Sequence, residues 1–288
     1  MERWLTRARG ETDKPIGIKI GGAKMGSNPN SAAFSASTAD LLKLLASGGH
    51  AAFFDDTNNE NLSSMRHSTT IGSQYGVRIW GEGDGGVPAV SYNQQRQNAA
   101  NLLMSGADTM HYAYVEWLFK GFDWSTASWT GNFEKTKHYY YLKSLNETVK
   151  QYRPAYEPSD VAFFQSHYTA WYRGKDKTNR DVSLVYDAEM THGAYGAYAS
   201  WGRYLTTPDV VDEQLILDDI LSRYKVLIVP NTSSTVTLKS VGDKIKAWVH
   251  NGGKLVTFGE GALTYEIDGD RQLVSAGAAD PANWSLGL

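Results

Sequence analysis

The chain has 288 residues, of which 41% are hydrophobic and 20% are charged, and its formal net charge at pH 7 is -3. This composition is typical of a globular protein, and the charge gives no reason to expect nucleic acid or an anionic membrane as a partner. Because the chain has no cysteine, a disulfide scaffold, a cysteine-ligated zinc site and a cysteine nucleophile are excluded. The polar N-terminus lacks the apolar core of a secretory signal, and no apolar run could span a bilayer, so we favour a cytoplasmic location.

The first half of the chain alternates apolar strands with helical stretches. The expected strands are Pro15–Ile20, His50–Phe54, Tyr75–Trp80 and Thr109–Val115. The expected helices are Thr38–Ala46, Asn61–Ile71, Tyr92–Ser105 and Lys135–Tyr152. This alternation predicts parallel βαβ units, and about four of them fit the C-terminal half of a (β/α)8 TIM barrel. Active sites of such barrels lie at the C-terminal ends of the strands.

The second half predicts a smaller α/β fold of Rossmann-like or flavodoxin-like type. A linker rich in proline, Pro154–Pro158, separates the halves. The expected elements that follow are Val161–Phe164, a helix at His192–Tyr204, a buried strand at Val226–Val229, a helix at Leu238–Asn251 and a strand at Lys254–Phe258. We therefore predict a half-barrel over residues 1–155, a second domain over 156–265, and a tail or the start of a further domain over 266–288.

The sharpest chemical signal is Glu82, which follows the third expected strand between Gly81 and Gly83. Glycines flanking a carboxylate allow a substrate to approach closely, because they add no side-chain bulk. A retaining glycosidase uses such a carboxylate as its nucleophile, with an acid/base partner roughly 5–5.5 Å away. The alternative is a tight turn whose glutamate points into solvent.

Two other interpretations of these loops are weaker. Gly81, Gly83 and Gly86 match the dinucleotide fingerprint, but Glu82 and Asp84 would place negative charge beside a pyrophosphate. The acidic segment at 55–60 could indicate calcium, yet it lacks the glycine and the final glutamate of a calcium loop. The seven histidines show no metal-binding spacing either, so we expect no cofactor and no metal.

Further polar and aromatic residues stand near the expected strand ends and could bind sugar hydroxyls or stack on a sugar ring. The chain is rich in aromatic residues, at 12%, and such rings offer broad apolar faces. Each of these residues could equally be a plain loop or packing residue. The candidates for substrate binding are Asp55, Asn58, Trp80, Asp84, Glu116 and Trp117.

The order of these parts resembles glycoside hydrolase family 42, the β-galactosidases of clan A. Three stretches carry the likeness: the strand YGVRIWGEG at 75–83, the helix and strand at 101–117, and the segment from Asp209 through Tyr265. The resemblance implies that Glu82 is the nucleophile, that the substrate is an oligosaccharide or polysaccharide with a β-galactoside bond, and that the second domain is an amidotransferase-like trimerisation domain without an active site.

One feature departs from the family. In this clan the acid/base glutamate ends the fourth barrel strand, usually after an asparagine, whereas Asn59-Glu60 and Asn146-Glu147 fall in an expected loop and an expected helix. The resemblance therefore implies that the first half of the barrel lies outside this sequence. The chain could then be part of an enzyme, or a non-catalytic remnant that binds carbohydrate or scaffolds an assembly.

Overall fold

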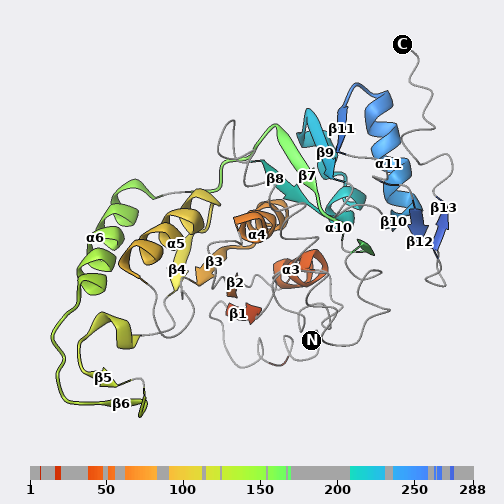
Figure 1. Ribbon diagram of the computed structural model, residues 1–288. Coiled ribbons are helices and arrows are strands. Elements are labelled where there is room, and N and C mark those ends of the chain that lie inside the picture. Colours follow the sequence, from red (N-terminus) through yellow and green to blue (C-terminus); the bar gives the residue numbers. More distant parts are fainter. Residues whose placement is uncertain are drawn as a thin grey trace.

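The fold is taken from a computed structural model (Figure 1). The described residues are 7, 17–20, 38–47, 51–55, 62–82, 91–111, 115–123, 125–153, 155–166, 168–169, 208–230, 236–258, 263, 265–267 and 273–275. The fold is mixed α/β and is built on parallel sheets. Among the described helices, none is long and apolar enough to cross a membrane.

The first sheet contains four parallel strands in the order β1-β2-β3-β4. Its strands are β1 (Gly17–Ile20), β2 (Ala51–Asp55), β3 (Ile79–Glu82) and β4 (Thr109–His111), and its helices are α3 (Thr38–Ser47), α4 (Leu62–Tyr75) and α5 (Tyr92–Met104). Neighbours in the sheet are therefore neighbours in the chain, which is the arrangement of successive units in a (β/α)8 barrel. Closure into such a barrel remains a prediction.

Two expected strands have different bounds. Tyr75 is the last residue of α4 and is followed by Gly76, whose φ of 71° suits glycine best, so β3 begins only at Ile79. The strand expected at Thr109–Val115 ends at His111. His111 pairs with Glu82, the last residue of β3.

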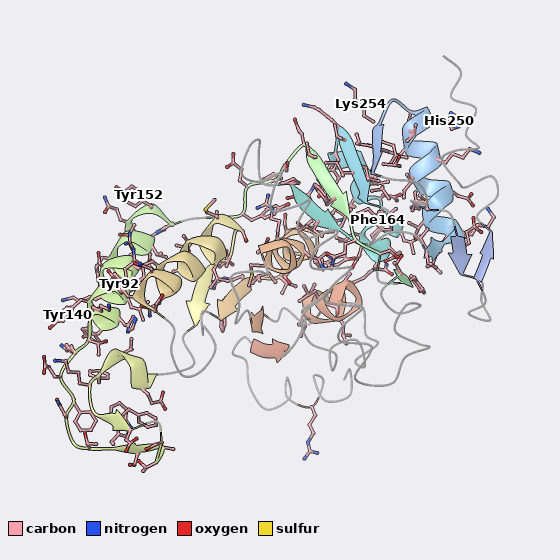
Figure 2. All side chains as sticks on the ribbon, viewed as in Figure 1. Tyr92, Tyr140, Tyr152, Phe164, His250 and Lys254 are labelled. Carbon is pink, nitrogen blue, oxygen red and sulfur yellow. The ribbon has the colours of Figure 1, made fainter. Side chains whose placement is uncertain are left out.

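A helical and hairpin extension follows β4. The 3-10 helix η1 (Val115–Leu118) leads into a short antiparallel hairpin of β5 (Phe122–Asp123) and β6 (Ser128–Trp129). The long helix α6 (Lys137–Tyr152) ends this part at Arg153, which has a left-handed backbone conformation. Tyr140 and Tyr152 project from α6 into solvent (Figure 2).

The second sheet is also parallel and has the order β11-β9-β7-β8. Its strands are β7 (Val161–Phe164), β8 (Asp209–Val211), β9 (Val226–Pro230) and β11 (Lys254–Phe258). In chain order this is 2-1-3-4, the beginning of the flavodoxin-like arrangement. The helix expected at His192–Tyr204 lies outside the described residues, and the domain bounds and amidotransferase-like assignment remain predictions.

Three helical segments and a small sheet complete this half. They are α10 (Glu213–Leu217), η3 (Ile220–Arg223) and α11 (Lys239–His250), with β10 (Val236–Leu238), β12 (Tyr265–Ile267) and β13 (Leu273–Ser275). One apolar core runs without interruption from the helices of the first sheet to α10, η3 and β9 of the second. Its fully buried members include Leu42, Met65, Ile71, Leu102, Leu215, Ile216, Ile220 and Leu227.

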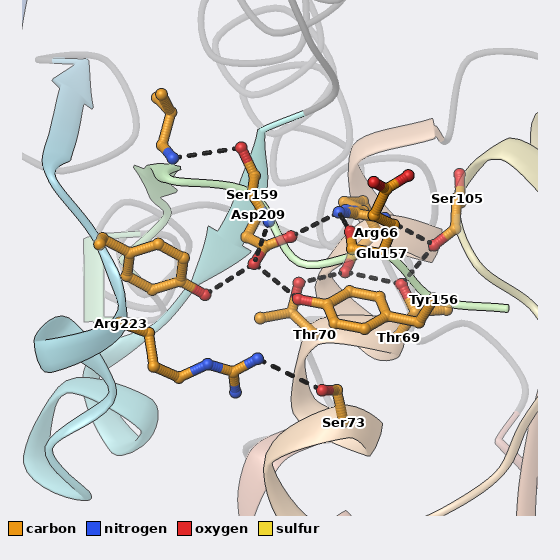
Figure 3. A network of polar contacts seen from close by, with 12 residues as sticks. Arg66, Thr69, Thr70, Ser73, Ser105, Tyr156, Glu157, Ser159, Asp209 and Arg223 are labelled. Carbon is orange, nitrogen blue, oxygen red and sulfur yellow. Dashed lines mark hydrogen bonds and ion pairs between the residues drawn. The ribbon is translucent and has the colours of Figure 1, made fainter.

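Helix α4 lies between the two sheets (Figure 1), and its Arg66 forms a buried ion pair (Figure 3). Arg66 Nη2 lies 2.7 Å from Asp209 Oδ1 of β8, and the two side chains are 3% and 0% exposed. Tyr156 and Tyr224 donate hydrogen bonds of 2.6 and 2.9 Å to the other carboxylate oxygen. Burial, and then the neighbouring Asp209 carboxylate, raise the pKa of both tyrosines, so they remain protonated donors.

A second contact, beside α10, lies nearer to solvent. Asp218 accepts hydrogen bonds from Lys43 Nζ at 2.8 Å and from Tyr75 Oη at 2.6 Å. Burial alone would raise the pKa of Asp218, but the hydrogen bonds from Lys43 and Tyr75 outweigh it and hold this pKa below its ordinary value. A lowered folded-state pKa contributes stability above the unfolded pKa, which is lost as the pH falls through the folded value.

Replacing Arg66 by methionine should lower the free energy of unfolding by about 3 to 5 kcal/mol, because Asp209 would be left buried without its countercharge. Urea denaturation followed by circular dichroism measures the change. Arg78→Met is the matched control, since Arg78 is 65% exposed and its pair with Asp108 should contribute no more than about 1 kcal/mol. Equal losses in the two variants would contradict the assigned role of Arg66.

Replacing Asp218 by asparagine should flatten the acid side of the stability profile. The native chain should lose stability as the pH falls below about 4, the unfolded value for an aspartate, and the variant should lack this component. Urea midpoints between pH 3 and pH 7 measure it. Asp243→Asn is the control, because Asp243 forms an exposed pair with Lys239 within one helix.

Candidate functional site

The first sheet has one face toward its helices and one face away from them. An added Cβ on Gly81 would lie 2.6 Å from Leu102 of α5, and one on Gly72 of α4 would lie 2.6 Å from Ile79. Residues 79 and 81 of β3 therefore face the helices. Because successive residues of a strand alternate between faces, Trp80 and Glu82 belong to the opposite face.

The strand register extends this opposite face across the sheet. Phe53 pairs with Trp80, which pairs with Thr109, and one pleat further Asp55 pairs with Glu82, which pairs with His111. Adjacent strands lie about 4.8 Å apart, so the backbones of these partners are close neighbours. Asp55, Glu82 and His111 are the last residues of β2, β3 and β4, which places two carboxylic residues and an imidazole at the carboxyl edge of the sheet.

The sequence-predicted residues fall into three groups. Asp55 and Glu82 are neighbours in register, and Trp80 shares their face one pleat below, with its indole nitrogen shielded from solvent. Asn58 and Asp84 lie outside the described residues. Glu116 and Trp117 stand in η1 and not at the end of a strand.

The position of Glu116 corrects the sequence-based expectation. The alternating segment after Thr109 predicts a longer strand, but β4 ends at His111 and Val115 already belongs to η1. Glu116 is half-buried in η1, and its Oε2 atom is shielded from solvent without a hydrogen-bond partner among the described residues.

Two residues of the site face were not expected from the sequence. His111 was not a candidate because the sequence predicts a strand that continues to Val115, whereas β4 ends at His111. Lys19 pairs with Phe53 and so shares the face that carries Trp80. The signal for both residues is the register of the sheet, which the spacing of apolar residues along a single strand does not contain.

The strand-end row has the groups needed for polar substrate binding and for nucleophilic attack by a carboxylate. Among the described side chains, no three histidine, aspartate or glutamate residues gather as ligands of a metal ion. A cavity of about 730 Å³ lies elsewhere, between η3 and α11, and includes Tyr224, Lys244 and Trp248. It contains none of the predicted site residues, and its Lys244 is paired with Asp219.

Comparisons with known proteins give a partial likeness among solved structures. No protein-family model matches the chain, and no curated protein matches it. Among solved structures, the β-galactosidase from Bifidobacterium adolescentis is 18% identical over 38% of this chain and 43% of that chain, with a TM-score of 0.28. The chain thus spans less than half of that enzyme's length, and a likeness at this level does not identify the family of this chain.

Gly81 should tolerate no larger residue, because α5 packs directly on it. Gly81→Ala should lower the free energy of unfolding by about 1 to 3 kcal/mol, since the new methyl group would meet Leu102 at 2.6 Å. Urea denaturation measures the loss. In the Leu102→Ala background the same substitution should cost less, and an equal cost in both backgrounds would contradict the assigned contact.

Proposed function

We propose that this chain belongs to a retaining glycoside hydrolase that cleaves a β-glycosidic bond, with Glu82 as the nucleophile. The observation that carries the proposal is the register of Asp55, Glu82 and His111 at the carboxyl ends of three successive parallel strands. This is the edge at which β/α barrels place their catalytic groups. Packing of the sheet gives no reason for two neighbouring carboxylic residues at this edge.

In the proposed reaction the Glu82 carboxylate attacks the anomeric carbon, and the bond from that carbon to the leaving oxygen breaks. An acid/base carboxyl group protonates the leaving oxygen, and water then releases the sugar from the glycosyl-enzyme. We assign this acid/base to a further β/α unit outside the sequence. The Asn146-Glu147 pair lies within α6, where Glu147 is 64% exposed and pairs with Lys150, a position typical of a surface residue.

The remaining candidates surround the nucleophile as substrate contacts. Asp55, one strand away, accepts hydrogen bonds from sugar hydroxyls. Trp80, on the same face two residues before Glu82, lies beneath the bound sugar. Asn58, Asp84, Glu116 and Trp117 complete this proposed set. The choice of a β-galactoside, and of a trimer formed through the second half, follows from the sequence resemblance to glycoside hydrolase family 42.

Trapping of the covalent intermediate tests the nucleophile. A dinitrophenyl 2-deoxy-2-fluoro-β-galactoside carries a leaving group that departs without protonation, so the missing acid/base does not prevent labelling. Mass spectrometry of the digested protein should find one glycosyl adduct, on Glu82. Glu82→Gln should remove the label, whereas Glu147→Gln, on the exposed face of α6, should keep it.

The alternative is a non-catalytic remnant that binds carbohydrate or acts as a scaffold. It is favoured because no Asn-Glu pair stands at a strand end among the described residues, and Asn59-Glu60 lies outside them. An unlabelled native chain would support this alternative. An adduct on a residue other than Glu82 would reject the assigned nucleophile while keeping the enzyme class.

A further inference from the structure

An exposed pair of aromatic rings lies on the extension that follows β4. Trp129 ends β6 and Phe133 follows shortly after it, and their side chains are 37% and 60% exposed. Single exposed aromatics are common on protein surfaces, but neighbouring ones that form a continuous apolar patch mark a binding surface. We call the surface formed by Phe122, Trp129 and Phe133 the hairpin platform.

The rings of the hairpin platform are held in a fixed order. Phe122 meets Trp129 edge to face, with centroids 5.2 Å apart and ring planes at 69°. Trp129 and Phe133 have centroids 5.1 Å apart and planes inclined by only 31°. Phe122 therefore fixes the orientation of the indole, and the other two rings present a broad apolar surface to solvent.

The residues around these rings are short and polar. Between Phe119 and Thr136 the sequence contains no leucine, isoleucine, valine or methionine. Hydroxyl groups stand there instead: Ser125 donates to Asp123 at 2.7 Å, and the hydroxyls of Thr126 and Ser128 lie 2.7 Å apart. Each hydroxyl retains further capacity to donate or accept, which is what a ligand with many hydroxyl groups requires.

This chemistry fits a sugar better than an apolar protein surface. A pyranose ring offers C–H groups on its faces, which pack against the negative face of an aromatic ring, and hydroxyls at its rim. Aromatic rings also anchor protein interfaces, so the hydroxyl groups beside the rings are the feature that favours a sugar. The hairpin platform complements both features of the sugar: its aromatic rings can pack against the C–H faces, and the hydroxyls around them can bind the sugar hydroxyls.

The platform is firmly attached on the side of the candidate site. The chain leaves the carboxyl end of β4 and passes through η1 into the hairpin, so the hairpin is part of the loop between β4 and α6. In β/α barrels these loops surround the substrate. The base of the hairpin is tied by a hydrogen bond of 2.9 Å from Thr136 N to Leu118 O and by the Lys120–Glu134 pair at 2.8 Å.

We propose that the hairpin platform binds the sugar rings of a β-linked glycan chain, beyond the bond that is cleaved. The substrate would then be an oligosaccharide or polysaccharide with several residues in contact with the protein. The choice of glycan rests on the proposed function, but binding at the platform does not require Glu82 to react.

Affinity electrophoresis in gels that contain soluble β-galactan tests the proposal. The native chain should be retarded, and Trp129→Ala and Phe133→Ala should each weaken retardation at least tenfold, while Trp129→Phe should keep part of it. Tyr152→Ala is the matched control, because Tyr152 is a 72% exposed aromatic residue at the far end of α6. Thermal unfolding should be nearly unchanged in Phe133→Ala and Tyr152→Ala, whose rings are 60% and 72% exposed, and Trp129→Phe keeps a ring in contact with Phe122 and Phe133.

Three outcomes separate this proposal from others. Retardation of Glu82→Gln equal to that of the native chain would support the platform even if the trapping experiment failed. An unretarded native chain, or alanine variants that bind like it, would overturn the platform. A change of oligomeric state in Trp129→Ala or Phe133→Ala, measured by sedimentation, would identify the surface as an interface between copies and also overturn it.

Discussion

The buried pair of Arg66 and Asp209 constrains the whole described fold. Taking both charges out of water is costly, and the cost is met only while the guanidinium, the carboxylate and the two tyrosine hydroxyls keep their positions. Arg66 lies on α4, the helix that connects β2 to β3. The strands whose ends carry Asp55 and Glu82 are thus held in place from the second sheet.

Helix α4 was predicted from the sequence as an element, but the burial of its polar side chains was not. The alternation of apolar strands and helices predicted the strands of the first sheet, three strands of the second sheet and the longer helices, and Val161–Phe164 and Lys254–Phe258 were predicted to the residue. The short elements η1, β5, β6, β10, β12 and β13 were not predicted. The polar composition of α4 gave no sign that Arg66 and His67 are both buried. Polar residues are buried when partners satisfy them, and here the partner of each, Asp209 or Asp212, lies more than 140 positions away in the chain.

The candidate site was predictable in its residue types but not in its geometry. Glu82 and Asp55 stood out because carboxylates at strand ends need an explanation beyond packing, and the register places them side by side. His111 was missed and Glu116 was misplaced for one reason. The end of a strand depends on how far its neighbour continues, and apolar periodicity within one segment carries no information on that neighbour.

The continuity of the apolar core also bears on how such a chain can be divided. A cut near residue 155 follows the change in amino-acid composition at the proline-rich linker. It would expose Met65, Arg66 and Ile71 of α4 to solvent, and all three are buried in the intact chain. The visible linker is therefore a poor guide to a separable folding unit. Recombination that exchanged either half for a foreign one would have to supply a new surface for α4, so the two halves are expected to be inherited together.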